Sequence, residues 1–448
     1  MAISDLHASY RCINQCEGEY TLDEIIYRCP KCDDLLEVIH DLQPLAKHSG
    51  HEWKAIFEQR YQLRTGIAAS GVWAKQEWVH PHLDEHNLVS LGEGYSHLLK
   101  AERLGRHLQL DHLYLKQCGN SHTGSFKDLG MTVLVSQVRQ MIARGRRIKA
   151  VICASTGDTS AALAAYCPAA NIPAVVLLPA DKISPAQLIQ PIAHGALTLA
   201  LETDFDGCMR LVQQLAEQAD IYLANSMNSL RLEGQKTVAF EIVQQLDWRV
   251  PDWVIVPGGN LGNVSALGKG FLMMRALGVI DRLPRLVCAQ AEHANPLYES
   301  FQNNFHEFKA KLAQATLASA IQIGAPVSYK KAISILREFD GVVEQASEHE
   351  LANAAALADR CGLFVCPQTG VALAALAKMA ARRAIKQSDN VVVISTANGL
   401  KFADFKIAYH QQAIKDIAFY YANRVQALPA DLQKVNDAIK AFASSVIK

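Results

Sequence analysis

From Asp111 onward, short apolar runs alternate with longer amphipathic stretches. A continuous apolar run of about four to eight residues is typical of a strand buried on both faces, as strands of parallel sheets are. The alternation therefore predicts βα units around a mostly parallel sheet. The expected strands cover residues 112–116, 149–154, 172–178, 197–201, 221–224, 253–257, 286–289 and 391–395.

Other segments have the spacing of helices. The uncharged stretch 159–180 is broken by Pro168 and Pro173, so it predicts a buried helix, a turn and a strand and not a membrane span. Helical periodicity marks three further segments, residues 232–246, 368–380 and 431–447.

Length and composition narrow the class of protein. The chain has 448 residues, half of them apolar, which predicts two or more packed domains. Lysine plus arginine number 44, as do aspartate plus glutamate, so net charge gives no reason to expect nucleic acid or an acidic membrane as partner. The cysteines number eleven, and residues 1–10 lack the basic and apolar regions of a signal peptide. We therefore expect a cytoplasmic protein.

The first ninety residues have a different pattern, which predicts an N-terminal arm or small domain over residues 1–88. It carries two pairs of cysteines, Cys12 with Cys16 and Cys29 with Cys32. The second pair has the C-x₂-C spacing of structural zinc sites, whereas the first is C-x₃-C. The four thiols are candidate zinc ligands, and the alternative is a reduced, metal-free cluster.

Ligands of parallel sheets bind at the carboxyl ends of strands, so the loops there are the candidates for chemistry. The loop after residues 112–116 delivers Lys127 to the start of a predicted helix. The positive end of the helix dipole makes a lysine there easier to deprotonate, as an amine that forms a Schiff base must be. A solvated first-turn lysine is the ordinary alternative.

Three more loops follow predicted strands. Residues 155–160 form a hydroxyl-rich turn suited to helix capping or anion binding. Residues 257–263 contain three glycines, whose amides can converge on a phosphate, and residues 395–401 place hydroxyls after the last strand. Each could be an ordinary cap or turn. Together they suit pyridoxal 5′-phosphate (PLP), with a lysine for its aldehyde, glycines for its phosphate and a hydroxyl for its pyridine nitrogen.

Four motifs closely resemble threonine synthases of the plant-like branch, and the similarity extends from about Tyr10 to the C-terminus. The resemblance implies an α/β protein of PLP fold type II, the two-domain tryptophan synthase β-like fold, with mostly parallel sheets flanked by helices and an N-terminal cysteine-containing arm. It places the catalytic core at 89–448, with a mobile small lobe at roughly 130–225. The motifs are residues 121–130, 153–162, 225–237 and 257–263.

The resemblance also implies roles for single residues. Lys127 would be the Schiff-base lysine and proton shuttle, Phe126 would lie near the cofactor ring, and Thr396 would meet the pyridine nitrogen. The cofactor phosphate would be held by Gly258, Gly259, Asn260, Leu261, Gly262 and Asn263. The substrate carboxylate and the cofactor O3′ would be met by Ser155, Thr156 and Asp158. The substrate phosphate would be met by Thr159, Ser226, Arg231 and Asn260.

Some positions depart from the wider family. Ser121-His122 replaces a frequent Asn-Pro and Asp158 a frequent Asn, both of which fit the plant-like branch. Asn398 replaces a common His, which leaves the role of that position in doubt. Arg231 on its own would be read as a surface or helix-end arginine.

The implied reaction converts O-phospho-L-homoserine and water to L-threonine and phosphate, by γ-elimination followed by β-addition of water. A homodimer is implied too. Activation by S-adenosylmethionine is known in that branch, but the sequence contains no recognisable site for it. Two alternatives stay open, a serine/threonine deaminase of the same fold and a cofactor-free binding protein.

Overall fold

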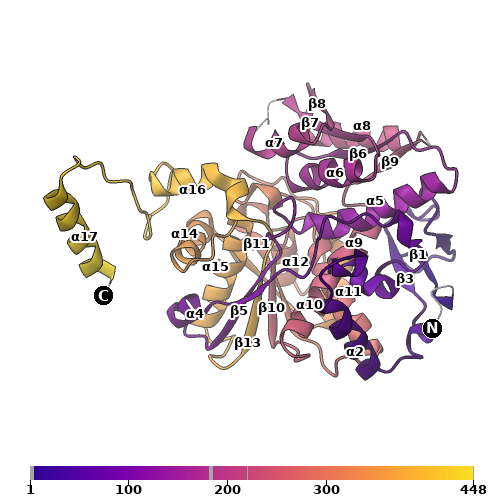
Figure 1. Cartoon of the computed structure of the whole chain (residues 1–448), viewed down its shortest axis with the longest axis horizontal. Coiled ribbons are helices and arrows are strands. Elements are labelled where there is room, and N and C mark those ends of the chain that lie inside the picture. Colours follow the sequence, from indigo (N-terminus) through magenta and orange to yellow (C-terminus); the bar gives the residue numbers. More distant parts are fainter. Residues whose placement is uncertain (1–4, 181–184, 219, 447–448) are drawn as a thin grey trace.

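The computed structural model describes residues 5–180, 185–218 and 220–446. Its strands form three sheets, with orders β12-β11-β10-β13-β5-β4, β8-β7-β6-β9 and β2-β1-β3. Figure 1 shows the six-stranded sheet in the centre of the molecule, the four-stranded sheet above it and the N-terminal strands at one side.

The six-stranded sheet is parallel except at one edge, where the short β4 pairs antiparallel with β5. Alternate residues of β10 face opposite sides: Val254 packs in one core and Ile255 in another. Helices cover both faces, which is why the central strands β10 and β13 have continuous apolar runs. The strands are β4 (Leu98–Lys100), β5 (His112–Gln117), β10 (Trp253–Pro257), β11 (Arg285–Ala291), β12 (Val342–Ala346) and β13 (Asn390–Ser395). The helices that cover the faces include α10 (Thr237–Gln245), α11 (Gly262–Ala276), α13 (Tyr329–Glu338), α14 (Glu348–Arg360) and α15 (Pro367–Ala381).

The four-stranded sheet is wholly parallel. Val151 of β6 packs with α5 and α6 on one face, while Ile152 packs with α8 on the other. After β5 of the six-stranded sheet, which we call the large sheet, the chain enters α5, and α5 packs on the four-stranded sheet, the small sheet. The chain therefore crosses from one sheet to the other where α5 begins. The strands are β6 (Ala150–Ala154), β7 (Ala174–Pro179), β8 (Leu197–Leu201) and β9 (Ile221–Leu223). The helices are α5 (Lys127–Ala143), α6 (Asp158–Ala169), α7 (Pro185–Ala193) and α8 (Phe205–Ala216).

The N-terminal sheet is antiparallel and consists of β1 (Ala8–Cys12), β2 (Tyr20–Thr21) and β3 (Leu36–His40). It packs through β3 against α9 (Leu230–Gln235), and α2 (Gly50–Tyr61) follows it in the chain. The remaining helices are α1 (Leu42–Leu45), α3 (Gln76–Val79), α4 (Glu102–Leu108), α12 (Pro296–Gln302), α16 (Ala403–His410) and α17 (Leu432–Val446).

All eight predicted strands are strands in the structure, and the mostly parallel arrangement is confirmed. The stretch 159–180 is a helix, a turn and a strand, as expected. The prediction of one helix over 232–246 is wrong in one respect, because the segment forms two helices, α9 and α10, separated at Lys236. The predicted helix 431–447 is α17, and residue 447 lies outside the described residues.

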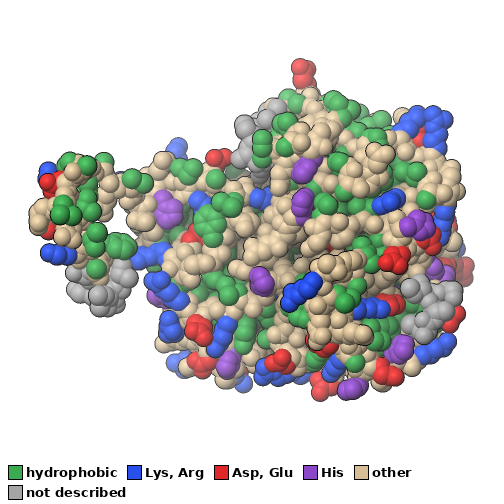
Figure 2. Space-filling view, viewed as in Figure 1, with side chains coloured by type: hydrophobic (Ala, Val, Ile, Leu, Met, Phe, Trp, Pro, Cys, Tyr) green, Lys and Arg blue, Asp and Glu red, His purple; other side chains and the backbone are tan. Residues whose placement is uncertain are grey.

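The C-terminal helix α17 extends away from the body of the protein (Figure 1). Acidic and basic side chains are interspersed over the visible face (Figure 2), as the balanced composition suggests. Among the described residues, no helix combines the length and apolar character needed to span a membrane.

Candidate active site

The lysine predicted to hold the cofactor is the first residue of α5. Its Nζ lies 4.3 Å from the centre of the Phe126 ring. Loss of water around the ammonium, and to a smaller extent the charge of Arg231, lower the pKa of Lys127 to about 7, although Asp158 opposes the shift. A large fraction of this amine is therefore neutral near pH 7, which is the state that can react with an aldehyde.

The loop before Lys127 is held by hydrogen bonds. The carboxylate of Asp128 accepts from Ser121 Oγ at 2.5 Å and from the Thr123 amide at 2.8 Å. The Phe126 amide donates to the carbonyl of Thr396 at 2.9 Å. The strands β5 and β13 are parallel neighbours, so the loops after them meet. Lys127 and Thr396 are thereby fixed next to each other.

Lys127 faces a cavity with about 730 Å³ of empty space, part of it open to solvent. Asp158 comes from the helix α6 of the small sheet, whereas Thr396 follows a strand of the large sheet. The cavity is therefore built where the two sheets meet. Its lining consists of Phe126, Lys127, Asp158, Ser226, Arg231, Leu232, Gln235, Pro257, Gly259, Asn260, Leu261, Gly262, Asn263, Ala320, Ile321, Ile323, Gln368 and Thr396.

The glycine loop joins β10 to α11 at one wall of this cavity. At Gly258 a Cβ atom would lie 2.4 Å from Cys288 Sγ, so a side chain does not fit there. Helix α11 begins at Gly262, and the preceding Leu261 is left-handed (φ 65°) without a side-chain cap. The amides of the first helical turn have no intrahelical acceptors and carry the positive end of the helix dipole. This wall is suited to bind a phosphate.

Arg231 is a buried cation at the cavity, only 3% exposed. Its guanidinium donates to the Ala224 carbonyl at 3.0 Å and to Thr159 Oγ1 at 3.3 Å, while Nε is buried without a partner. No carboxylate pairs with it within the described ranges of the chain, and burial lowers its pKa to about 10. A guanidinium at that pKa is still charged near pH 7. A buried charge without a counter-ion is costly, so the site calls for an anionic ligand.

Comparison with known proteins agrees with this geometry. The family described as "Pyridoxal-phosphate dependent enzyme" matches residues 89–397. Threonine synthase 2, chloroplastic, of Arabidopsis thaliana is 53% identical over 428 residues, which cover 95% of this chain and 83% of that protein. The chain belongs to the threonine synthase family of PLP-dependent enzymes.

A second relative supports the assignment, and a solved structure shows the shared fold. Threonine synthase of Methanocaldococcus jannaschii is 39% identical over 90% of this chain and 96% of its own length. The crystal structure of threonine synthase from Escherichia coli superposes with a TM-score of 0.68 at 19% identity and covers 95% of this chain and 94% of that one, which shows the shared fold. The predicted PLP fold type II is thus confirmed.

The residues of this threonine synthase family member fit the cofactor of the family. The amine of Lys127, the glycine loop and the hydroxyl of Thr396 line a single cavity, as an aldehyde, a phosphate and a pyridine nitrogen require. Several buried polar atoms at its walls also lack partners, namely Nδ2 of Asn263 and both amide atoms of the Gln368 side chain. Buried polar groups are rarely left unsatisfied, so a polar ligand accounts for them.

Some predicted site residues lie differently from the others. Ser155, Thr156 and Gly258 do not line the cavity, and Thr159 reaches it through its hydrogen bond from Arg231. The turn 155–160 precedes α6, but no side chain caps the helix there, because the N-cap position is Gly157. The capping interpretation of this turn is therefore wrong.

Two other positions gained a structural explanation. Asn398 Oδ1 accepts from the Leu400 amide at 3.0 Å, so this side chain caps the short 3₁₀ helix Gly399–Phe402. Lys401 Nζ lies 3.2 Å from Asp158 Oδ1 and donates to the Thr123 carbonyl at 2.9 Å. Lys401 thus neutralises a carboxylate that would otherwise repel an anionic substrate.

Gln235, Gln368 and the apolar wall at Ile321 and Ile323 were not predicted as site residues. Gln368 was predicted only as the first residue of a helix, and the adjacent Pro367 marks the start of that helix, not a ligand site. Residues 320–323 lie between α12 and α13, at the end of the short 3₁₀ helix Ser319–Ile321 and just after it. No spacing in the sequence connects them with Lys127, because they meet only after both sheets form.

Proposed function

We propose that this chain converts O-phospho-L-homoserine and water to L-threonine and phosphate. Arg231 carries the proposal, because it is a buried guanidinium without a carboxylate partner in the described structure and shares a cavity with Lys127. The glycine loop accounts for one phosphate, that of the cofactor. The guanidinium of Arg231 then needs a second anion, and the phosphate of a phosphorylated amino acid supplies it.

The residues around Arg231 suit a phosphate ester. A guanidinium can donate to two phosphate oxygens at once, and Thr159 and Ser226 add neutral hydroxyl donors beside it. Asn260 Nδ2 lies 3.4 Å from Ser226 Oγ, which links this subsite to the glycine loop. Deaminases of the fold act on substrates without a phosphate, so they have no need of a cation in this place.

When bound, PLP supplies an electron sink that stabilises negative charge on the carbons next to the substrate amine. The neutral amine of Lys127 can accept a proton from the α-carbon and hold it on Nζ for a later transfer. Arg231 keeps the substrate phosphate in place and stabilises its charge as the bond to the γ-carbon breaks. Ile321 and Ile323 give this part of the cavity an apolar wall, which disfavours water beside the reacting carbons.

The test is a product balance with purified protein and O-phospho-L-homoserine. We expect threonine and inorganic phosphate in equal amounts. Ammonia and a 2-oxo acid formed from serine or threonine at a higher rate, without a phosphate ester, would favour the deaminase. Purified protein that lacks cofactor absorbance between about 410 and 430 nm after incubation with PLP would contradict the enzyme assignment itself.

We also propose that the protein is a homodimer and is located in the cytoplasm. A homodimer is supported by the family resemblance and by exposed apolar residues on the protruding α17, such as Leu432 (84% exposed). Sedimentation of the purified protein would test it. A cytoplasmic location is supported by the eleven unbridged cysteines. Fluorescence imaging of a tagged chain tests that location. An effect of S-adenosylmethionine would be seen as a change in the rate of phosphate release.

A further inference from the structure

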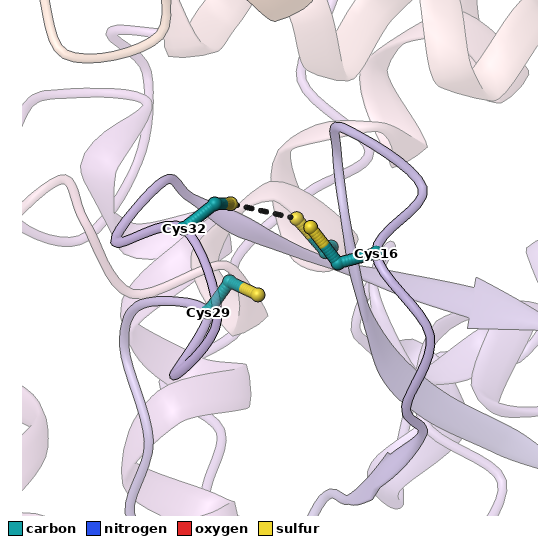
Figure 3. A group of neighbouring side chains, drawn as sticks. Cys16, Cys29 and Cys32 are labelled. Carbon is teal, nitrogen blue, oxygen red and sulfur yellow. Dashed lines mark hydrogen bonds between the residues drawn. The ribbon is translucent and has the colours of Figure 1, made fainter.

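The two cysteine pairs of the N-terminal arm come together in space. Ligand atoms of Cys12, Cys16, Cys29 and Cys32 all lie within 4.8 Å of one another, and the Sγ atoms of Cys12 and Cys32 are 3.5 Å apart. Figure 3 shows Cys29 and Cys32 on one loop, with their sulfurs directed toward the loop that carries Cys16. A tetrahedral Zn²⁺ with Zn–S bonds of about 2.3 Å needs sulfurs about 3.8 Å apart. Binding therefore requires the closest pair of sulfurs to move slightly apart and the more distant pairs to approach by no more than about 1 Å.

The surroundings suit thiolates. All four cysteines are unbridged. The Asn14 amide donates to Cys12 Sγ at 3.4 Å, and Asn14 Nδ2 lies 3.6 Å from Cys32 Sγ. Such N–H donors stabilise the negative charge that four thiolates leave on a zinc site. Cys12 and Cys29 are buried while Cys32 is exposed, so an ion can reach the cluster from the side of Cys32.

The cysteines close a segment that contacts both sheets, which we name the bridging loop (residues 13–35). Toward the small sheet, its Leu22 carbonyl accepts from Gln137 Nε2 of α5 at 2.8 Å, and Tyr27 Oη accepts from the Leu223 amide of β9 at 2.8 Å. Toward the large sheet, Asp34 pairs with Lys330 of α13. The only regular element in this loop is the two-residue β2.

With so little regular structure, the loop depends on its side-chain contacts, among them the buried Leu22 and Leu35. A metal that joins both ends of such a loop can add to those contacts by fixing its shape. Cys12 lies opposite Leu36 in the β1–β3 pairing, and the Leu36 carbonyl accepts from Lys331 Nζ at 2.7 Å and from Ser229 Oγ, at the start of α9. The cluster therefore stands at the point where the loop joins the catalytic core.

We propose that Cys12, Cys16, Cys29 and Cys32 bind one structural Zn²⁺ and that the metal holds the bridging loop in the shape that contacts both sheets. Binding converts four thiols to thiolates and releases four protons to solvent. Four protein ligands leave no open position, and none of the four lines the active-site cavity, so the metal takes no part in the reaction.

The first test is elemental analysis of the full chain purified without chelator. We expect about one zinc per chain. A thiol-modifying mercurial should release that zinc while it modifies these four cysteines, as peptide mapping would show. Zinc far below one equivalent in folded protein, even after incubation with reductant and Zn²⁺, would overturn the proposal. So would iron in its place, or zinc released with the four cysteines unmodified.

The second test uses the double variant Cys29→Ser/Cys32→Ser, with Cys361→Ser as a matched control outside the cluster. The double variant should lose the zinc, and the control should retain it. Limited proteolysis then reports on the loop: cleavage between residues 13 and 28 should accelerate at least about tenfold in the double variant, because the open ends unfold locally. Equal cleavage rates would refute the role of the metal in the loop. If the double variant does not fold, wild-type protein stripped of zinc and then reloaded provides the same comparison.

Discussion

The helix α9 has two faces with opposite electrostatics, although it is only six residues long. On the cavity face, Arg231 is a buried cation with no carboxylate partner in the described chain. On the opposite face, Glu233 is a buried carboxylate with several partners: His40 Nε2 and Lys236 Nζ donate to it at 2.8 and 2.5 Å, and Lys269 pairs with it too.

This difference between Glu233 and Arg231 indicates that the first residue stabilises the fold and that the second is placed to bind a ligand. Although burial opposes ionisation, Lys236, Lys269 and His40 keep the pKa of Glu233 well below its ordinary value. The Glu233 carboxylate is thus paired within the protein, and the network joins the N-terminal sheet to the core. Arg231 is left unsatisfied, and a protein tolerates such a cost where a ligand offsets it. Substitutions on the two faces should therefore affect different properties.

The largest effect is expected at Lys127, whose amine shares the cavity with Arg231. Lys127→Ala removes the amine proposed to hold the cofactor and to move the proton, so turnover should fall by about a thousandfold or more. The absorbance between about 410 and 430 nm should be lost, although PLP could still bind through its phosphate. The surface variant Lys309→Ala should behave as wild type. Near-normal turnover of Lys127→Ala would remove the basis of the site assignment.

On the face of α9 opposite the cavity, Glu233→Gln should chiefly affect stability. It leaves the buried Lys236 and the half-buried Lys269 near each other without this counter-charge, which should lower the free energy of unfolding by about 3–5 kcal/mol. Urea denaturation measures this. Glu338→Gln breaks an exposed pair with Arg275 and is the control, with a small expected change. An equally small loss for both variants would show that the buried network contributes little.

Arg231→Ala should have the reverse signature. Loss of a charge-assisted contact to the substrate phosphate should cost about 2–4 kcal/mol, or roughly thirty- to a thousandfold in kcat/KM. Stability should stay the same or rise, because an uncompensated buried charge is removed. Arg231→Lys should restore activity only in part, since an ammonium lacks the planar fork.

The control for Arg231 is a substrate without phosphate. Slow deamination of serine or threonine should be nearly unchanged in Arg231→Ala, and the cofactor spectrum should stay near that of wild type. If both activities fall by the same factor, Arg231 has a structural role and the contrast between the two faces of α9 fails.

The smallest effect is expected for the dependence of the free energy of unfolding on pH in mildly acidic solution. Burial, with a further contribution from Lys236, lowers the pKa of His40 from 6.5 to about 4. Between these values the unfolded chain binds a proton that the folded chain does not, so stability falls as the pH drops from 6.5 toward 4. The slope is about 1.4 kcal/mol per pH unit. In His40→Gln this dependence should be weaker by that amount, whereas the exposed His306→Gln should leave it unchanged. Parallel curves for both variants would contradict the assignment.

Much of the fold follows from local pattern. Runs such as Trp253–Pro257 are continuously apolar because both faces of the strand are covered, and that requirement is visible in the sequence. The edge strand β12 was missed, since Glu344 and Gln345 interrupt its apolar pattern. Arg382 pairs with Glu344 in the folded protein, which explains how a carboxylate is tolerated in that strand.

At the candidate site, local sequence features were enough to predict the residues proposed to carry the chemistry. Lys127 at a helix start, the glycines before α11 and the cysteine pairs are short-range features, and a short segment is enough to specify each of them. The resemblance of these motifs to those of a known family could be recognised for the same reason.

The surroundings of Lys127, the glycine loop and the cysteine pairs depend on contacts that form only in the folded protein. Gln368 and Ile321 line the cavity through contacts between segments far apart in the chain, and such contacts leave no periodic trace. The same holds for the different environments of Arg231 and Glu233. They are neighbours in the sequence, but which one is paired depends on side chains from the N-terminal sheet and α11, brought to α9 only by folding.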